Sequence, residues 1–193
     1  MRHKYETRGI VLSRVPAGEA HAHLALLTRD LGLVWARATG LRRSGGKLAS
    51  SLVTFAESDL VLVRGREGWR ITGAVLGVNW FARLTESEAR MRAARVAGLV
   101  LRLAPGETPE AEPFFIMTGF FGALLDPSAP SREGAELLAV ASLLSALGLD
   151  DEVVQPSSVE AIPAFSPARL AGVFGDREHY IARINRGIAA SGL

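Results

Sequence analysis

The chain has 193 residues, of which 48% are hydrophobic and 22% charged, so it can bury a substantial core and is not a disordered protein. It contains no cysteine, which excludes disulfide bonds, thiolate metal sites and cysteine nucleophiles. The net charge is only +2, but residues 1–83 hold 13 Lys and Arg against 6 Asp and Glu, whereas residues 84–193 hold 9 against 14. This asymmetry favours an anionic partner for the basic part and a different role for the acidic part.

Five short strands are predicted in the basic part. They cover residues 9–15, 21–28, 33–39, 59–63 and 69–76. Turn-forming residues separate them, such as Pro16 with Gly18 and the run from Arg29 to Gly32. Short strands so close together favour a small closed sheet, because closure removes exposed strand edges. An OB-like barrel is the natural candidate, although periodicity by itself does not separate it from an SH3-like barrel or a small sandwich.

The most informative stretch is residues 33–55. Its strand alternates, with Leu33, Trp35, Arg37 and Thr39 on one face and Val34, Ala36 and Ala38 on the other. The following loop carries Arg42, Arg43 and Lys47 around a Ser-Gly-Gly centre, which can lay positive charge along a polyanion.

Further cations lie on a second glycine-containing turn and on the strands. The candidate DNA-binding residues are Arg14, Arg37, Arg42, Arg43, Lys47, Arg64, Arg66 and Arg70. We expect these side chains to converge on one side of the sheet and to follow a nucleic-acid backbone with slight sequence preference. Trp35 and Trp69 could stack on bases, but we expect both indoles in the barrel core.

The acidic part is predicted to be helical. A capping box at residues 85–88 starts an amphipathic helix that ends before Pro105, with Glu86/Arg90 and Glu88/Arg92 as i,i+4 pairs. Two further helices cover residues 113–125 and 132–147, and the aromatic side chains of the first of these are expected in the core. Ser166 and Pro167 open a short helix to Phe174. A last helix from Asp176 places Tyr180, Ile181, Ile184 and Ile188 on one side.

No catalytic motif is present. The sequence lacks a phosphate-loop pattern, HExxH and GxSxG, so an enzyme is not predicted and catalytic residues are none. His21 and His23 share a strand face but have no further ligands nearby, and residues 150–152 are typical of a solvated acidic loop. We therefore expect no metal and no cofactor.

The chain carries no sign of membrane insertion or export. Its longest nearly apolar run, residues 114–125, is shorter than the ~20 residues that a membrane-spanning helix needs. The charged N-terminus is followed by a strand-like run rather than an apolar signal core. We expect a cytoplasmic protein without a membrane partner.

Four stretches of the basic part share residue types, order and spacing with a known family. They are residues 7–12 (TRGIVL), 23–34 (HLALLTRDLGLV), 40–48 (GLRRSGGKL) and 52–55 (LVTF). In these stretches the chain resembles the N-terminal domain of the RecO family of bacterial recombination and repair proteins. The later helices, including residues 143–149 (LLSALGL), resemble the family's helical domain only loosely.

The resemblance implies an α+β protein with two domains. Residues 1–83 would form a basic, DNA-binding OB-fold β-barrel, and residues 84–193 a small acidic helical bundle suited to protein docking. The family binds single- and double-stranded DNA, promotes strand annealing and, with RecR, helps to load RecA onto DNA coated by single-strand-binding protein. DNA, RecR and single-strand-binding protein are therefore the implied partners in DNA repair.

Two features depart from the family pattern. Thr39 stands where the family usually has a lysine before the hairpin glycine, so Arg37 or Arg42 would replace that contact. Many members carry a four-cysteine zinc module, which this cysteine-free chain cannot form. Two other functions remain compatible with the residues: an RNA-binding or ribosome-associated OB module, and a scaffold whose helical part docks a protein. The sequence does not reveal the oligomeric state.

Overall fold

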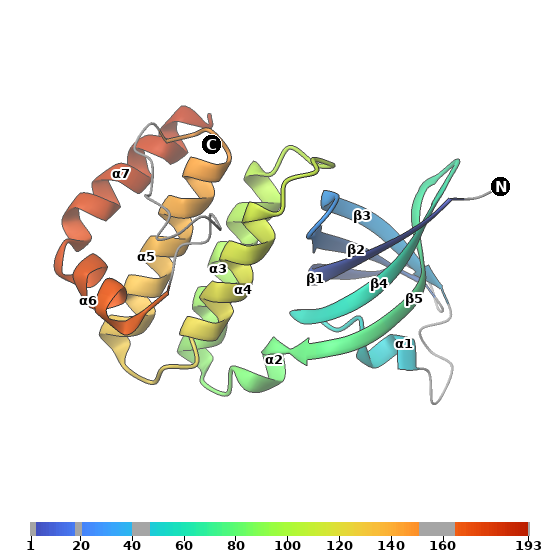
Figure 1. The fold of residues 1–193 in the computed structure, drawn as a ribbon, viewed down its shortest axis with the longest axis horizontal. Coiled ribbons are helices and arrows are strands. Elements are labelled where there is room, and N and C mark those ends of the chain that lie inside the picture. Colours follow the sequence, from blue (N-terminus) through green and yellow to red (C-terminus); the bar gives the residue numbers. More distant parts are fainter. Residues whose placement is uncertain (1–2, 18–20, 40–46, 151–164, 193) are drawn as a thin grey trace. The chain divides into compact units, whose positions relative to one another are not determined.

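A computed structural model of the chain describes residues 3–17, 21–39, 47–150 and 165–192 (Figure 1). Its contacts divide the chain into two compact units. The barrel unit comprises Met1–Arg83 with Pro105–Phe114, and the helical unit comprises Leu84–Ala104 with Phe115–Leu193. The segment at residues 105–114 thus groups with the barrel although it follows the first long helix.

Five strands close into the barrel. They are β1 (Lys4–Ala17), β2 (His21–Thr28), β3 (Gly32–Thr39), β4 (Ala56–Gly65) and β5 (Gly68–Asn79). The strand order is β1-β2-β3-β5-β4, and β1 also pairs with β4. Neighbouring strands are antiparallel except β3 and β5, which are parallel. The structure therefore decides among the architectures left open by the pattern in favour of an OB-fold barrel and, with the helices that follow, confirms the α+β class.

β1 is longer than predicted because one strand serves two neighbours. Lys4–Ile10 pair with β4 and Gly9–Ala17 pair with β2. A register shift between Val11 and Ser13 lets the strand bend from one partner to the other. The predicted start at Gly9 was wrong. Residues 4–8 carry several charges and do not have the pattern of a strand, but all of them pair with β4. β4 and β5 also extend beyond their predicted ends.

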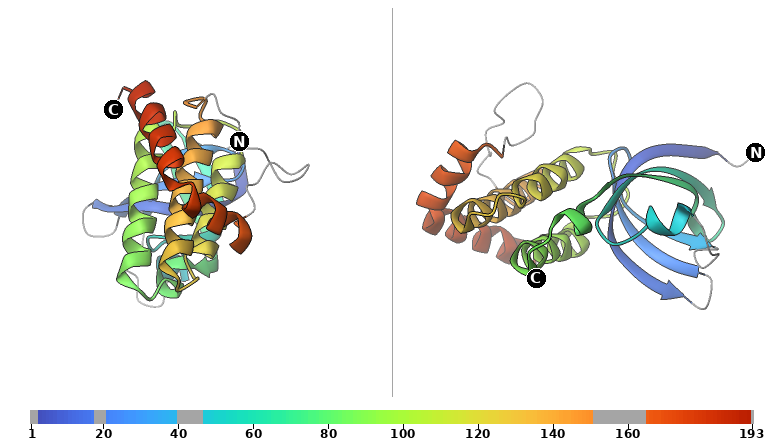
Figure 2. Two further views of the ribbon diagram at one scale, coloured as in Figure 1. Left: turned by 90° about the vertical axis from the view of Figure 1, so that its left-hand side faces the viewer. Right: turned by 90° about the horizontal axis from the view of Figure 1, so that it is seen from below.

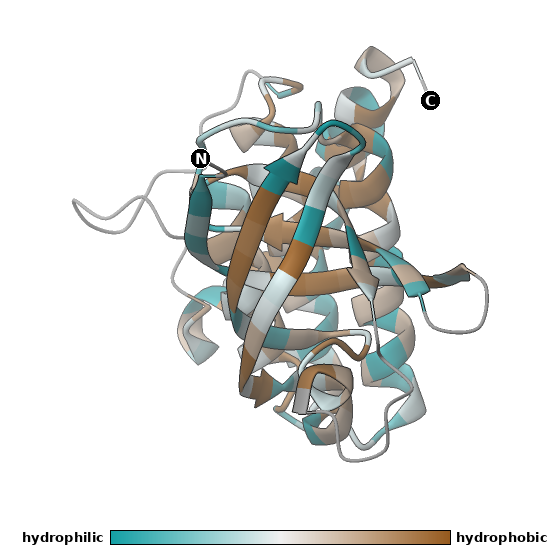
Figure 3. Cartoon of the chain, turned by 90° about the vertical axis from the view of Figure 1, so that its right-hand side faces the viewer, coloured by the Kyte–Doolittle hydropathy of each residue, from teal (hydrophilic) through white to brown (hydrophobic). Residues whose placement is uncertain are grey.

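Hydrophobic residues follow one another along much of the barrel strands (Figure 3), and one cluster of them fills the interior. Its buried members are Val11, Ala22, Leu24, Leu26, Val34, Ala36, Ala38, Leu52, Leu60, Leu62, Trp69 and Ile71. Small alanines on β2 and β3 lie beside large side chains from β4 and β5, as a narrow barrel requires. The interior face of β3 is therefore the Val34/Ala36/Ala38 face, and the opposite face is left for other contacts.

Two short helices flank β4 and β5: α1 (Lys47–Ser50) and α2 (Trp80–Arg83). The indole Nε1 of Trp80 donates a 2.8 Å hydrogen bond to the buried carboxylate of Glu57. Arg8 Nε lies 2.7 Å from the other oxygen of the same carboxylate. A hydrogen bond and an ion pair thus offset the cost of burying this charge, and they connect β1, β4 and α2.

The segment at residues 105–114 is attached to the start of β3. The backbone N–H of Leu33 donates to the carbonyl of Gly106 at 3.0 Å, and Gly32 forms a β-bridge with Glu107. Gly32 has a φ of +69°, and a Cβ there would lie 2.6 Å from the carbonyl oxygen of Thr108. Glycine is therefore required at residue 32 by both its backbone conformation and the close approach.

The helical unit contains five helices over its described residues (Figures 1 and 2). They are α3 (Ser87–Leu103), α4 (Glu112–Ala123), α5 (Ala129–Ala146), α6 (Pro167–Gly175) and α7 (Arg177–Ala190). α5 contacts α3, α6 and α7 and so forms the centre of the unit. The predicted aromatic core is confirmed, since Phe120 and Phe121 are fully buried, whereas Leu125 at the end of the same run is exposed.

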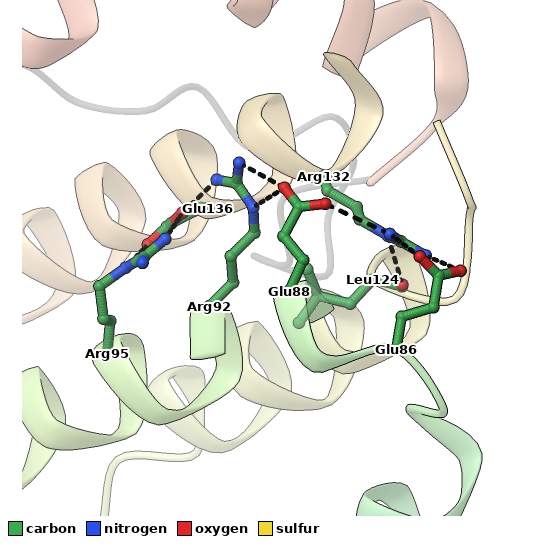
Figure 4. A network of polar contacts seen from close by, with 7 residues as sticks. All are labelled: Glu86, Glu88, Arg92, Arg95, Leu124, Arg132 and Glu136. Carbon is green, nitrogen blue, oxygen red and sulfur yellow. Dashed lines mark hydrogen bonds and ion pairs between the residues drawn. The ribbon is translucent and has the colours of Figure 1, made fainter. Parts of the chain in front are cut away.

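The predicted capping box at the start of α3 is wrong. Glu86 occupies the N-cap position, and no side chain caps the helix. Instead, both carboxylate oxygens of Glu86 accept from the guanidinium of Arg132 on α5, at 2.7 and 2.8 Å (Figure 4). The carboxylate of Glu88 accepts from Arg92 at 2.9 Å, as its i,i+4 spacing predicted. The carboxylates at the start of α3 thus accept hydrogen bonds from arginine side chains rather than from the helix backbone.

These contacts belong to a network that joins α3 to α5 (Figure 4). Arg132 is only 3% exposed and also donates to the carbonyl of Leu124. Glu136 on α5 binds both Arg92 and Arg95 of α3. Hydrogen bonding from Arg132 lowers the pKa of Glu86 below its ordinary value. The carboxylates of Glu86, Glu88 and Glu136 are therefore already paired with arginines of the same unit.

The sequence pattern predicted α6 better than α7. The N-cap at Ser166 is confirmed, because its hydroxyl accepts from the backbone N–H of Arg169 at 3.4 Å. On α7 the apolar side recognised in the sequence is not the buried one, since Ile181 is 44% exposed and the buried residues are Arg183 and Gly187. Arg183 pairs with the buried carboxylate of Asp150, so a charged residue occupies the inner side.

Candidate nucleic-acid interface

An open groove lies on the barrel unit between the outer faces of β2 and β3 and the β4–β5 hairpin. Its volume is about 1090 Å³. The lining residues are His23, Trp35, Arg37, Thr39, Val63, Arg64, Gly65, Arg66, Glu67, Gly68, Trp69 and Arg70. Four of the predicted DNA-binding arginines therefore line one groove, although they come from three strands and a turn.

Strand register places two of these arginines side by side. β3 and β5 pair in parallel, with Arg37 directly opposite Arg70. On its other side Arg37 is opposite His23 of β2. All three side chains are exposed, so they form a continuous polar row across β2, β3 and β5. His23 was not among the predicted site residues, because only the pairing of strands reveals that it neighbours Arg37.

Trp35 lies on the same outer face of β3, and its predicted place in the core is wrong. The side chain is 56% exposed. The alternation of β3 was predicted correctly, but the smaller Val34, Ala36 and Ala38 face inward and Trp35 faces outward with Arg37 and Thr39. The shared face with a cation and a threonine was the sequence signal for this exposure.

Trp69 is in the core, as predicted, but it also borders the groove. It is 5% exposed, and its ring packs edge-on against Tyr5 at a centroid distance of 5.0 Å. The guanidinium carbon of Arg64 lies 5.1 Å from the Trp69 ring centroid, within the range of a cation–π contact. Among the described residues, the indole N–H of Trp69 has no hydrogen-bond partner.

Arg64 has a second contact, which the sequence did not suggest. Its guanidinium forms an ion pair with Glu107 of the segment attached to β3. The two side chains are 56% and 43% exposed, so the pair lies in contact with solvent. Arg64 is therefore held between an aromatic ring and a carboxylate at the edge of the groove.

Of the remaining predicted site residues, only Arg14 has a described side chain, and it does not line the groove. Arg14 is partly buried and donates to the backbone carbonyl of Leu52 at 3.4 Å, which gives it a contact within the barrel. Arg42 and Arg43 lie outside the described residues. Lys47 begins α1, and its side chain is likewise outside the description.

No other site emerges from the described side chains. Within the described ranges, no three His, Asp or Glu residues are grouped so that they could hold a metal ion. None of the helices described is both long and apolar enough to cross a membrane. The groove offers cations, an exposed indole and backbone turns, which together suit binding of an extended anion rather than bond-making chemistry.

The chain is similar to known proteins that share one name, DNA repair protein RecO. Residues 1–76 match the family model described as Recombination protein O N terminal. The chain is 35% identical over 120 residues to a protein named DNA repair protein RecO from Rubrobacter xylanophilus, covering 62% of this chain and 48% of the relative. It is 34% identical over 125 residues to the Synechococcus protein of the same name, covering 58% and 43%.

A third relative extends further into the helices. The Cyanothece protein, also named DNA repair protein RecO, is 29% identical over 158 residues, covering 80% of this chain and 53% of the relative. The chain thus spans about half the length of these curated relatives. Over residues 1–76 the barrel is thus similar to the N-terminal domain of the RecO family, and the similarity to DNA repair protein RecO continues into the helices of this chain.

Proposed function

We propose that this chain acts in DNA repair and that its barrel binds DNA along the groove. The convergence of Arg37, Arg64, Arg66 and Arg70 on one groove carries the proposal. Cations spaced along an open groove neutralise successive phosphates and release counterions, which is the main source of sequence-independent affinity. The relatives named as DNA repair proteins support DNA as the polyanion.

The arrangement also supports strand annealing. Two complementary strands repel each other through their phosphates, and a protein that screens this repulsion while leaving the bases free promotes pairing. No catalytic residue is needed for this activity. Following the family, we further propose that the chain assists RecA loading together with RecR on DNA coated by single-strand-binding protein.

Equilibrium binding over a series of salt concentrations tests the DNA-binding proposal. Single-stranded DNA, duplex DNA and RNA of equal length are each titrated with the protein and followed by fluorescence anisotropy. Four phosphate contacts predict that log affinity for single strands falls with log salt with a slope of about −2.8, from ~0.7 per contact. Tighter binding to RNA than to either DNA would instead favour an RNA-binding module, and absence of binding to all three would reject the proposal.

Variants of the groove make the test specific. The double variant Arg37→Gln/Arg70→Gln removes two adjacent cations and should reduce the slope by about 1.4. Arg29→Gln is the matched control, because Arg29 is exposed on the same unit but does not line the groove. Arg29→Gln removes one cation instead of two, so a reduction of the slope half as large as in the double variant would show that overall charge, and not the groove, determines binding.

A further inference from the structure

Trp35 is unusual among the tryptophans of this chain. Trp69 and Trp80 are 5% and 7% exposed, whereas Trp35 is 56% exposed. Tryptophan is strongly buried on average, and leaving a large apolar ring in water forfeits the hydrophobic stabilisation that its burial would supply. Trp35 is part of the wall of the groove rather than of the barrel core. Its exposed ring is therefore available to a ligand that enters the groove.

Cations surround this ring. Arg37 follows two residues later on the same face of β3, and Arg70 lies beside Arg37 on β5. A nucleic-acid strand lying here can place phosphates on these arginines while one of its bases contacts the indole. Flat aromatic rings stack on bases of every type, because each base presents a π-face.

Only one form of nucleic acid can use such a ring fully. In a duplex, both faces of each internal base are covered by neighbouring base pairs, so the indole has no face to stack on. In a single strand the bases can be splayed apart and stacked on protein side chains. An exposed indole beside phosphate-binding cations thus discriminates between the two forms, whereas the cations alone do not.

We propose that Trp35 is a base-stacking platform that gives the groove a preference for single-stranded over duplex DNA. This inference rests on the proposed DNA-binding function and specifies which form of DNA the groove selects. The arginines supply the charge-dependent part of the affinity for both forms, and Trp35 supplies a part that only single strands receive.

The test compares Trp35→Ala, Trp35→Phe and Phe81→Ala with the wild type, using oligothymidylate and a duplex of equal length as probes. Loss of ~1–3 kcal/mol of stacking predicts that Trp35→Ala weakens single-strand binding roughly 5- to 140-fold. Duplex binding should change by less than about twofold, and the salt slope should stay the same, because phosphate contacts remain. Trp35→Phe keeps a ring and should retain most of the affinity. Phe81→Ala removes another exposed aromatic side chain of the same unit, outside the groove. It should change neither single-strand nor duplex affinity.

Tryptophan fluorescence gives an independent readout. Oligothymidylate should quench the emission of the wild type, and Trp35→Ala should lose most of this quenching, since the other two indoles are buried. Unchanged single-strand affinity in Trp35→Ala, or an equal loss for duplex and single strand, would overturn the stacking platform while leaving DNA binding intact. A wild type that binds neither probe would reject the proposed function itself.

Discussion

Arg64 and Glu107 form an ion pair at the edge of the groove, although they are 43 residues apart in the chain. Arg64 is one of the arginines proposed to contact phosphate, and Glu107 occupies it in the DNA-free barrel. The carboxylate is held there because its segment bridges to Gly32 at the start of β3. If DNA binds along the groove as proposed, the Glu107 carboxylate competes with a phosphate for the Arg64 guanidinium.

Removing this competitor should strengthen DNA binding. Glu107→Gln frees Arg64, and an exposed ion pair worth ~0.2–1 kcal/mol predicts a gain in affinity of about 1.4- to fivefold at low salt. The salt slope should stay close to that of the wild type, because Arg64 is already one of the four proposed phosphate contacts. Glu110→Gln removes the same charge from the same exposed segment and is the control. An equal gain in both variants would show a general effect of charge and no competition at Arg64.

Arg132 should be important for the stability of the helical unit. Its guanidinium is buried, binds Glu86 and Leu124, and connects α5 to the start of α3. Arg132→Met leaves the acceptors without their donor and should lower the free energy of unfolding by about 2 kcal/mol, measured by urea denaturation. Arg95→Met removes an exposed arginine of the same network and should cost less than about 1 kcal/mol. Similar losses in the two variants would contradict the special role of burial at Arg132.

The same network predicts a dependence of stability on pH. The pKa of Glu86 is lowered in the folded protein, chiefly by its hydrogen bond from Arg132. The ionised carboxylate therefore stabilises the fold above its ordinary pKa of 4.5, and this contribution is lost as the pH falls through the lower folded value. Glu86→Gln should be less stable than the wild type at neutral pH, and the difference should shrink on acidification. A difference that is constant with pH would rule out ionisation of Glu86 as its origin.

Close packing of α5 against α6 should make Gly134 intolerant of substitution. A Cβ at this position would lie 2.4 Å from the carbonyl oxygen of Leu170, which is backbone and cannot rotate away. Gly134→Ala should destabilise the helical unit by about 1–3 kcal/mol, as overpacking usually does. Gly98→Ala on α3 is the control, because nothing lies within 4 Å of its added Cβ and alanine favours a helix by up to ~1 kcal/mol. Thermal unfolding of both variants measures the contrast, and a Gly134→Ala protein as stable as wild type would contradict the packing.

Local pattern was sufficient for most elements of this protein. The alternation over residues 33–39, the turn at Gly32 and the helix start at Ser166 all depend on neighbours within a few residues, and each is found in the structure. The charge asymmetry likewise follows directly from the amino-acid sequence. These features are predictable because backbone conformation and side-chain periodicity are decided over short distances along the chain.

Tertiary structure alone decided which faces and which charges meet. Alternation is symmetric, so it identifies two faces of β3 without saying that Val34 faces inward and Trp35 outward. Barrel closure brings Arg37 beside Arg70. Helix packing makes Arg132 the hydrogen-bond partner of Glu86, in place of the backbone of α3. Such partners lie tens of residues apart, and only the filling of a common core selects them. The sequence thus determined the presence of the cations, and the fold determined that four of the arginines share one groove with an exposed tryptophan.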